Sequence, residues 1–177
     1  ETPDNYSFLA GFSEETLKFL ALYFYVKNRK EFDEPMDAVV YATLISLGFA
    51  AQENFYYVFD RVDGYSWSLA FYRALGAIPG HASFGIIMGY YYGQYILRGS
   101  KHLLLMSLAL PVIFHAAFNY LLGIDYLLFL VYGPLLSFYA VYLINTLLSW
   151  KRHNFILVLL AILSPYIWYV IFYALIV

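Results

Sequence analysis

Three ionisable side chains lie close together in an apolar stretch near the start of the chain. The run GFSEETLKFL at residues 11–20 contains Glu14, Glu15 and Lys18, and its flanks are rich in Phe, Leu, Tyr and Ala. On one helix, Lys18 follows Glu15 by three residues and Glu14 by four, so its ammonium group can contact either carboxylate. Charged groups are costly inside an apolar helix that crosses a membrane, and there they usually mark function.

Polar side chains recur in three further apolar segments. The segments are QENFYY, GHASFG and FHAAFNY, and they contain Glu53, Asn54, Tyr57, His81, His115 and Asn119. His115 and Asn119 are four residues apart and share a helix face, and Glu53 and Tyr57 share one in the same way. We therefore expect each helix to present one polar seam to the interior of a helix bundle.

Two carboxylates and two imidazoles, without a thiol or an activated serine, favour the activation of water. The chain contains no Cys, and no His-Asp relay supports Ser83, near His81, as a nucleophile. A buried glutamate can act as a general base, and Lys18 beside it favours the ionised form. Asn119 and His115 can donate hydrogen bonds to the oxyanion of a tetrahedral intermediate.

The same side chains could hold a metal ion. Two His and one Glu can bind Zn²⁺ tetrahedrally with water as the fourth ligand, while a second Glu takes a proton from that water. The expected ligands are His81, His115 and Glu15, with Glu53 as the alternative carboxylate. They would come from different helices, without the HExxH spacing. The sequence therefore leaves a Zn²⁺ mechanism and a metal-free glutamate mechanism both open.

The composition places these groups in an integral membrane protein. Hydrophobic residues make up 63% of the 177 residues, charged residues 12%, and the mean hydropathy is +0.65. Soluble domains have about a quarter of their residues charged. We therefore expect one all-α, membrane-embedded domain over residues 1–177. The lack of Cys excludes disulfides and thiolate sites, and the net charge of -2 argues against a nucleic-acid partner.

Six apolar segments, each near the roughly 20 residues needed to cross a bilayer, predict a polytopic transmembrane helical bundle. The expected spans are 7–26, 38–59, 80–97, 103–122, 126–149 and 155–177. Pro79-Gly80 breaks the run before the third span. Residues 67–77, with Trp67 and Arg73, are then expected to form a separate helix at the membrane interface. The alternative, one helix over 67–97, would be too long for a span.

Loop charges predict the orientation of these spans. On one side we expect Lys27, Arg29, Lys30, Arg98, Lys101, Lys151 and Arg152, and on the other Arg61 and Arg73. The side with more basic residues should face the cytoplasm, which leaves the start of the chain outside. Separately, Gly85, Gly89 and Gly93 repeat every fourth residue and predict close packing of their helix against a neighbour.

The polar residues then share one level near the outer face. At about 1.5 Å per residue from the outer helix ends, Glu15 lies roughly 12 Å deep, Glu53 roughly 9 Å and His115 roughly 10 Å. His81 comes out shallower, unless its helix begins earlier than expected. Three helices that run in alternating directions are therefore expected to bring their polar side chains into one pocket.

Four short motifs resemble those of the PrsW-type intramembrane proteases. EETLK is similar to the EExxK motif of that family, ENFYY to ENxxY, HASFG to HxxxG and HAAFN to HxxxN, in the order of the family and across residues 14 to 119. The wider relatives are the CAAX prenyl proteases and bacteriocin-processing proteins, whose first motif reads EExxxR. Here the basic residue is Lys18, one position earlier, which favours the PrsW branch.

The resemblance implies a multi-pass membrane protease of the cell membrane that cleaves membrane-anchored proteins, in some bacteria an anti-sigma factor on its outer side by site-1-type cleavage. It also implies roles for the motif residues. Glu15 or Glu14 would be the base and the other Glu a ligand or orienting group, and Lys18 would hold both ionised. His81 and His115 would bind a metal or polarise the carbonyl, with Asn119 at the oxyanion. Glu53 and Asn54 would complete the site.

The resemblance leaves the metal open and suggests a longer protein. The family has been described both as metalloproteases and as glutamate-dependent proteases. Its members often have more than six spans, and the chain begins with Glu1, so we expect a fragment or a processed form with an upstream helix missing. The sequence indicates no natural substrate, cleavage sequence or oligomeric state.

Two other classes of function fit part of the pattern. A proton- or cation-coupled transporter also uses Glu, His and Lys side chains as a relay inside a membrane. However, the inner half of every expected span lacks ionisable groups apart from the loop ends, which argues against a path through the membrane. A nonenzymatic scaffold is the third class, and it would tolerate the loss of the polar seam.

Overall fold

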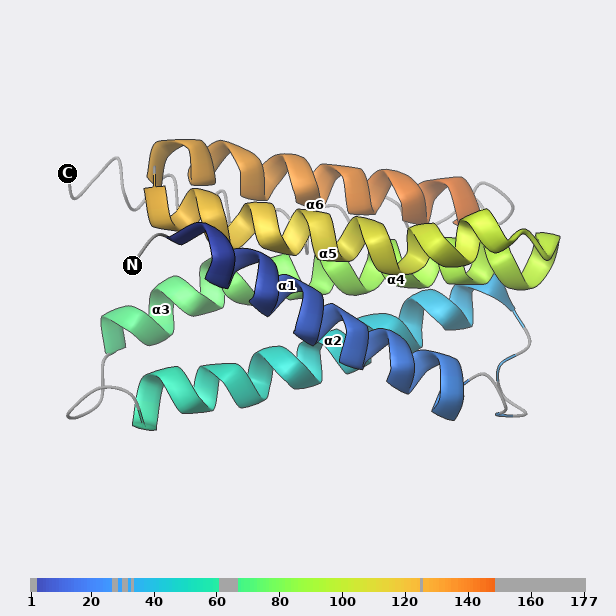
Figure 1. Ribbon diagram of the computed structural model, residues 1–177, viewed down its shortest axis with the longest axis horizontal. Coiled ribbons are helices and arrows are strands. Elements are labelled where there is room, and N and C mark those ends of the chain that lie inside the picture. Colours follow the sequence, from blue (N-terminus) through green and yellow to red (C-terminus); the bar gives the residue numbers. More distant parts are fainter. Residues whose placement is uncertain are drawn as a thin grey trace.

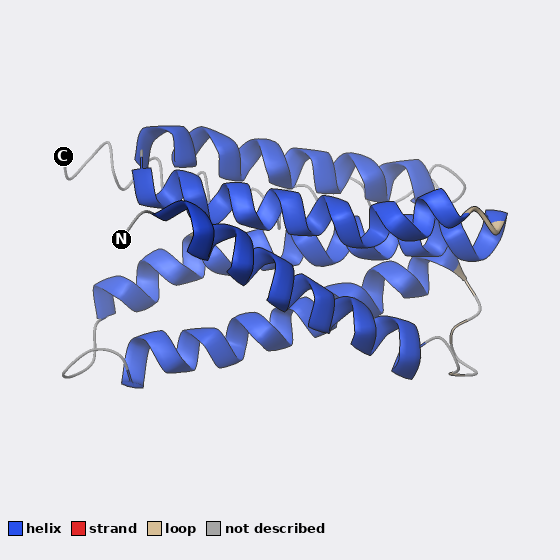
Figure 2. Cartoon of the chain, viewed as in Figure 1, coloured by secondary structure: helices blue, strands red, loops and turns tan. Residues whose placement is uncertain are grey.

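Every regular element in the described part of the chain is a helix. The computed structural model describes residues 3–26, 29, 32, 34–60, 67–124 and 126–148. Its α-helices are α1 (Pro3–Leu20), α2 (Pro35–Phe55), α3 (Trp67–Leu75), α4 (Ala77–Arg98), α5 (Lys101–Ile124) and α6 (Tyr126–Leu148). The π-helical turns η1 (Ala21–Val26) and η2 (Tyr56–Asp60) continue α1 and α2. The predicted all-α class is confirmed for these residues (Figure 2).

Five of the six expected spans correspond to described helices. The sixth, 155–177, lies outside the described residues, as do Lys27, Lys30, Arg61, Lys151 and Arg152, which were used for the orientation. Within the described residues, only α5 is both long and apolar enough by composition to cross a membrane, with a mean hydropathy of 1.7. A shorter apolar helical stretch covers Val131–Leu147 of α6.

The third span begins earlier than predicted. We expected the break at Pro79-Gly80, but α4 begins at Ala77 and the break falls at Gly76. Proline is tolerated in the first turn of a helix, because the N–H that it lacks would have no carbonyl partner there. As a result, His81 lies a full turn inside α4. The separate short helix that we expected over 67–77 is present as α3, which leads into α4 (Figure 1).

The glycines of α4 bring its backbone against α2. A Cβ atom on Gly85 would lie 2.7 Å from the Cα of Thr43, and one on Gly93 would lie 2.6 Å from the carbonyl oxygen of Pro35. Between them, a Cβ atom on Gly89 would overlap the backbone of α2 at Ala38. The predicted close packing along this face of α4 is confirmed, and its neighbour is α2.

A second close approach joins α1 to α5. A Cβ atom on Gly11 would lie 2.9 Å from the backbone nitrogen of Ala116, so these two helices also meet backbone to backbone. Figure 1 shows α1 running diagonally across the bundle, while α4, α5 and α6 run alongside one another. The contact places the turn that follows Gly11 beside the middle of α5.

The backbone contacts define two helix pairs, α2–α4 and α1–α5, and apolar side chains fill the space between them. One cluster joins α2, α4, α5 and α6 and includes Val39, Phe84 and Phe118. A second cluster joins η1, α2 and α4 around Leu22, Met88 and Tyr92. The pairs α2–α4 and α1–α5 therefore meet through side chains, whereas within each pair the backbones themselves are in contact.

Candidate active site

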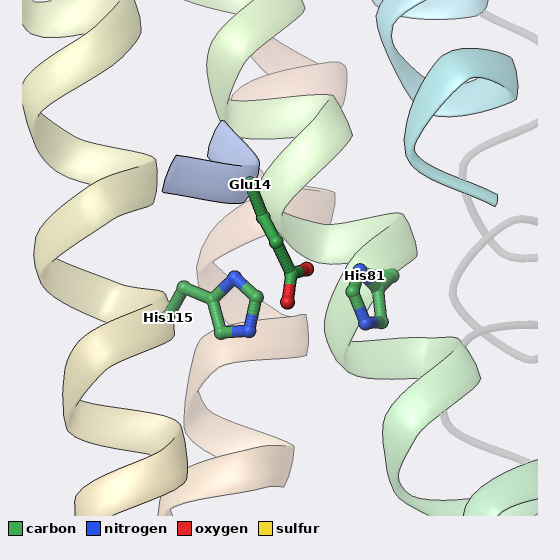
Figure 3. Close-up of side chains that lie close together, drawn as sticks. All are labelled: Glu14, His81 and His115. Carbon is green, nitrogen blue, oxygen red and sulfur yellow. The ribbon is translucent and has the colours of Figure 1, made fainter. Parts of the chain in front are cut away.

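Three ligand-type side chains converge from three helices. Glu14 of α1, His81 of α4 and His115 of α5 each offer one ligand atom, and these atoms lie within 4.8 Å of one another. The two imidazole rings are buried, with centroids 5.2 Å apart, and the Glu14 side chain is 25% exposed. Figure 3 shows the carboxylate of Glu14 pointing between the two rings.

The carboxylate between the imidazoles belongs to Glu14, whereas the expected ligand set named Glu15. Adjacent residues point about 100° apart around a helix of 3.6 residues per turn. Glu15 is fully buried, and its Oε1 lies 2.8 Å from Nδ1 of His115 and 2.6 Å from Nζ of Lys18. The two glutamates therefore meet different partners, and the sequence alone did not separate them.

Lys18 joins the acidic and the imidazole groups. Its fully buried ammonium group lies 2.6 Å from Glu15, 3.6 Å from Oε2 of Glu14 and 3.0 Å from Nδ1 of His81. The contacts with both glutamates are those that the spacing predicted, and the contact with His81 was not foreseen. A buried ammonium is tolerable only when paired, and these neighbours supply the pairing.

A separate carboxylate orients each imidazole. Because an ionised carboxylate only accepts hydrogen bonds, Nδ1–H of His115 donates to Glu15. Likewise, Nε2–H of His81 donates to Oε2 of Glu53 at 3.0 Å. This arrangement leaves Nε2 of His115 with a free lone pair, while Nδ1 of His81 accepts from the ammonium group of Lys18 at 3.0 Å. Carboxylates placed in this way fix ring orientation and raise basicity at metal-binding histidines.

Two further side chains support the imidazoles, and the sequence analysis did not single them out. The ring of Phe84 stacks on His115, with centroids 4.7 Å apart and planes inclined by 16°. The hydroxyl of Ser46 donates to the backbone carbonyl of His81 at 2.6 Å, which fixes α4 to α2 at this level. Neither residue carries a sequence signal stronger than its position in an apolar helix.

Arg73 is the charged residue that the sequence analysis missed as part of this site. Its Nη2 donates to Oε2 of Glu53 at 2.8 Å, and its Nε donates to Oδ1 of Asn54 at 2.6 Å. The guanidinium also lies over the ring of Tyr57, 4.3 Å from its centroid. The sequence had placed Arg73 in the interfacial helix over 67–77 and among the loop charges, although a cation close to the ENFYY segment was a usable signal.

The two asparagines do not join the central cluster. The side chain of Asn54 accepts its hydrogen bond from Arg73. Asn119 lies partly buried one turn beyond His115 on α5, and within the described residues it forms no hydrogen bond with the glutamates or the imidazoles. Its amide is thus near the cluster along the helix without being bonded to it.

The donor set fits a divalent metal ion. Two imidazoles and one carboxylate are ligands that Zn²⁺ commonly takes in catalytic sites, where water holds the fourth position. In addition, Oε2 of Glu15 is buried without a hydrogen-bond partner, which is costly for a carboxylate unless water or an ion meets it. The residues present therefore fit such an ion and a water molecule beside it.

Comparisons with known proteins agree with one another. The sequence profile described as "PrsW family intramembrane metalloprotease" matches residues 4–150. "Protease PrsW" from Clostridioides difficile (strain 630) is 34% identical over 122 residues, covering 67% of this chain and 51% of that protein. "Protease PrsW" from Bacillus subtilis (strain 168) is 38% identical over 120 residues, covering 66% and 53%.

The matches leave about half of each relative uncovered. The chain spans about half the length of the curated relatives it matches. No solved structure matches it. The matched region nevertheless contains every side chain of the cluster described above.

Proposed function

This chain belongs to the PrsW family of intramembrane metalloproteases, and from that premise we propose that it hydrolyses peptide bonds of membrane-anchored proteins. The observation that carries the proposal is the convergence of Glu14, His81 and His115 within 4.8 Å. An intramembrane anti-sigma factor, cut near the outer face of the cell membrane, is the substrate that we propose to test first. We take this choice of substrate from the family resemblance and not from any contact in the structure.

We assign the metal-binding role to Glu14, His81 and His115, with Zn²⁺ as the ion. When bound, Zn²⁺ supplies a lowered pKa for a coordinated water molecule and polarises a carbonyl oxygen. Glu53 and Glu15 each hold one ring nitrogen of His81 and His115, which leaves Nδ1 of His81 and Nε2 of His115 as the nitrogens that would bind the ion. At His81 the ion would replace the contact of Nδ1 with Lys18. The geometry thus favours Glu14 over Glu15 as the carboxylate ligand.

Glu15 is the proposed general base. Its Oε2 has no hydrogen-bond partner, while Lys18 and His115 both donate to its Oε1. Glu15 would accept a proton from water as the water oxygen bonds to the scissile carbonyl carbon, and it would deliver that proton to the amine when the C–N bond breaks. The ammonium group of Lys18 contacts both glutamates, and Asn119 is the proposed donor to the oxyanion.

The arrangement in the membrane is also a proposal. We propose that α1 with η1, α2 with η2, α4, α5 and α6 each span the bilayer in one domain. Large apolar side chains such as Phe24, Leu44 and Leu105 are exposed on these helices, as lipid-facing residues are. No residue of the short helix α3 is fully buried, and Trp67 at its start is 83% exposed, which supports a position at the interface.

Cleavage of a single-pass reporter in proteoliposomes tests the proposal. The parent chain should cleave the reporter, and Glu14→Gln, Glu15→Gln and His115→Ala should each reduce cleavage at least about a hundredfold. His102→Ala is the matched control, because His102 is an exposed imidazole on the same helix as His115. Parental rates for all three site variants would refute the protease. Proton- or cation-dependent uptake of a solute into the proteoliposomes, without cleavage of the reporter, would instead favour a transporter.

A further inference from the structure

The short helix α3 reaches the site through one side chain. Arg73 donates from Nη2 to Glu53 and from Nε to Asn54, which are neighbours near the end of α2. Its guanidinium covers the ring of Tyr57 one turn later. Three contacts from one cation thus hold the exposed end of the α2 segment that contains Glu53.

The form of these contacts suits arginine and not lysine. The guanidinium is planar, always charged and able to donate in two directions at once, whereas an ammonium group is a single point charge. Here the two donors serve acceptors on two different residues, at 2.8 Å and 2.6 Å. The Arg73 side chain is only 14% exposed, so water competes little for its hydrogen bonds. We therefore expect Glu53 to have little freedom to rotate.

The same carboxylate oxygen serves His81. Oε2 of Glu53 accepts from Nη2 of Arg73 at 2.8 Å and from Nε2 of His81 at 3.0 Å. The position of that oxygen determines how the imidazole ring turns, and so where its Nδ1 points. Nδ1 lies 3.0 Å from Lys18, on the side of the glutamates. Arg73, Glu53 and His81 thus form a line of contacts that ends at the cluster.

Arg73 attaches α3 to the end of α2 through its hydrogen bonds to Glu53 and Asn54. The placement of α3 and the orientation of the His81 ring are therefore linked through one guanidinium group. We propose that Arg73 is a positioning residue of the reaction, which holds Glu53 and through it orients His81. This inference rests on the proposed protease function.

Kinetics on four variants test the inference. Arg73→Ala should lower kcat about 10- to 100-fold, as the loss of such supporting contacts does at metal sites, and change KM by less than about twofold. Arg73→Lys keeps the charge without the fork and should recover part of the lost kcat. Arg98→Ala, at an exposed arginine of α4, is the matched control and should behave as the parent. The fourth variant is Arg73→Ala in a Glu53→Gln background, and Glu53→Gln alone is its reference.

The combined variant separates positioning from a general loss of structure. If Arg73 acts through Glu53, Arg73→Ala should cost little further kcat once Glu53→Gln is present. Equal and additive losses in the two backgrounds would overturn the inference. Parental kcat in Arg73→Ala would also overturn it, and either result would leave the protease function standing if the parent cleaves.

Nuclear magnetic resonance decides the point without any turnover. The chain has 4 His, so ¹⁵N-labelled imidazoles give few signals, which single His variants assign. Arg73→Ala should shift the ring nitrogens of His81 and leave those of exposed His102 unchanged. Unchanged His81 signals would overturn the inference. If the parent itself fails to cleave, the protease function fails, and this spectrum still decides whether Arg73 orients His81.

Discussion

Oε1 of Glu15 lies 2.8 Å from Nδ1 of His115, although the two residues are 100 positions apart in the chain. The contact is possible because Gly11, one turn before Glu15, lets the backbone of α1 meet that of α5. It turns the free Nε2 of His115 toward the other members of the cluster. The packing of two helices and the orientation of one imidazole are therefore parts of the same arrangement.

The two adjacent glutamates should have separable roles. Glu14→Gln removes a proposed ligand, so we expect both zinc content and cleavage to fall. Glu15→Gln should keep zinc within about twofold of the parent, because the amide oxygen can still accept from Nδ1–H of His115. It should lose cleavage at least about a hundredfold, because the proton acceptor is removed. Elemental analysis and reporter cleavage on the same preparations measure the two quantities. Loss of zinc in Glu15→Gln alone would reverse the assignment.

Removal of the metal should lower both activity and thermal stability. The proposed ligands come from α1, α4 and α5, and a ligand that binds only the folded state stabilises it by about 2.7 kcal/mol at 100 times its Kd. We expect a chelator to lower Tm and abolish cleavage, and Zn²⁺ to restore both. Zinc below about a tenth of an equivalent, with full activity after chelation, would instead favour the metal-free glutamate mechanism.

Replacing Lys18 should destabilise the fold. Lys18→Met leaves two glutamates without their shared cation inside the protein, and breaking a buried ion pair by removing one partner costs about 3–5 kcal/mol. Thermal or denaturant unfolding in detergent measures the change. Lys101→Met is the control, since Lys101 is exposed at the start of α5. Equal stability of the two variants would show that Lys18 is dispensable for folding.

A single methyl group on the α4 glycine face should also be costly. Gly89→Ala places Cβ against the α2 backbone at Ala38, and forcing extra atoms into a packed site costs about 1–3 kcal/mol. Cleavage should fall as well, since α2 carries Glu53 and α4 carries His81. Gly48→Ala is the control, because nothing lies within 4 Å of the added Cβ there. A Gly89→Ala protein as stable and active as Gly48→Ala would contradict this account.

The helices and the candidate site were predictable to different degrees. Apolar length located every described long helix within a few residues, because that signal is local. The start of α4 was wrong, because Pro79 reads as a helix break and yet fits the first turn. The four motifs brought out the glutamates and imidazoles together. Which glutamate contacts which imidazole depends on how each helix is rotated about its axis, and no local sequence pattern predicts that rotation.

The roles of Glu14 and Arg73 in the cluster could not be predicted from the sequence. The choice between Glu14 and Glu15 depends on the rotation of α1 against α5, set by the contact at Gly11. The role of Arg73 depends on where the short helix α3 lies against the end of α2. Both depend on the tertiary packing of helices, which no local sequence pattern encodes.

The division of the cluster between two closely joined helix pairs has a consequence for the surrounding lipid. Glu14 and His115 belong to the α1–α5 pair, and His81 belongs to the α2–α4 pair. Spans respond to a thinner or thicker bilayer by tilting, and each pair should tilt as a unit because its backbones touch. The distance between the ligand atoms of the two pairs would then vary with the acyl chain length of the lipid. The rate of the proposed cleavage would therefore depend on bilayer thickness, and comparing that rate in short- and long-chain vesicles would measure the dependence.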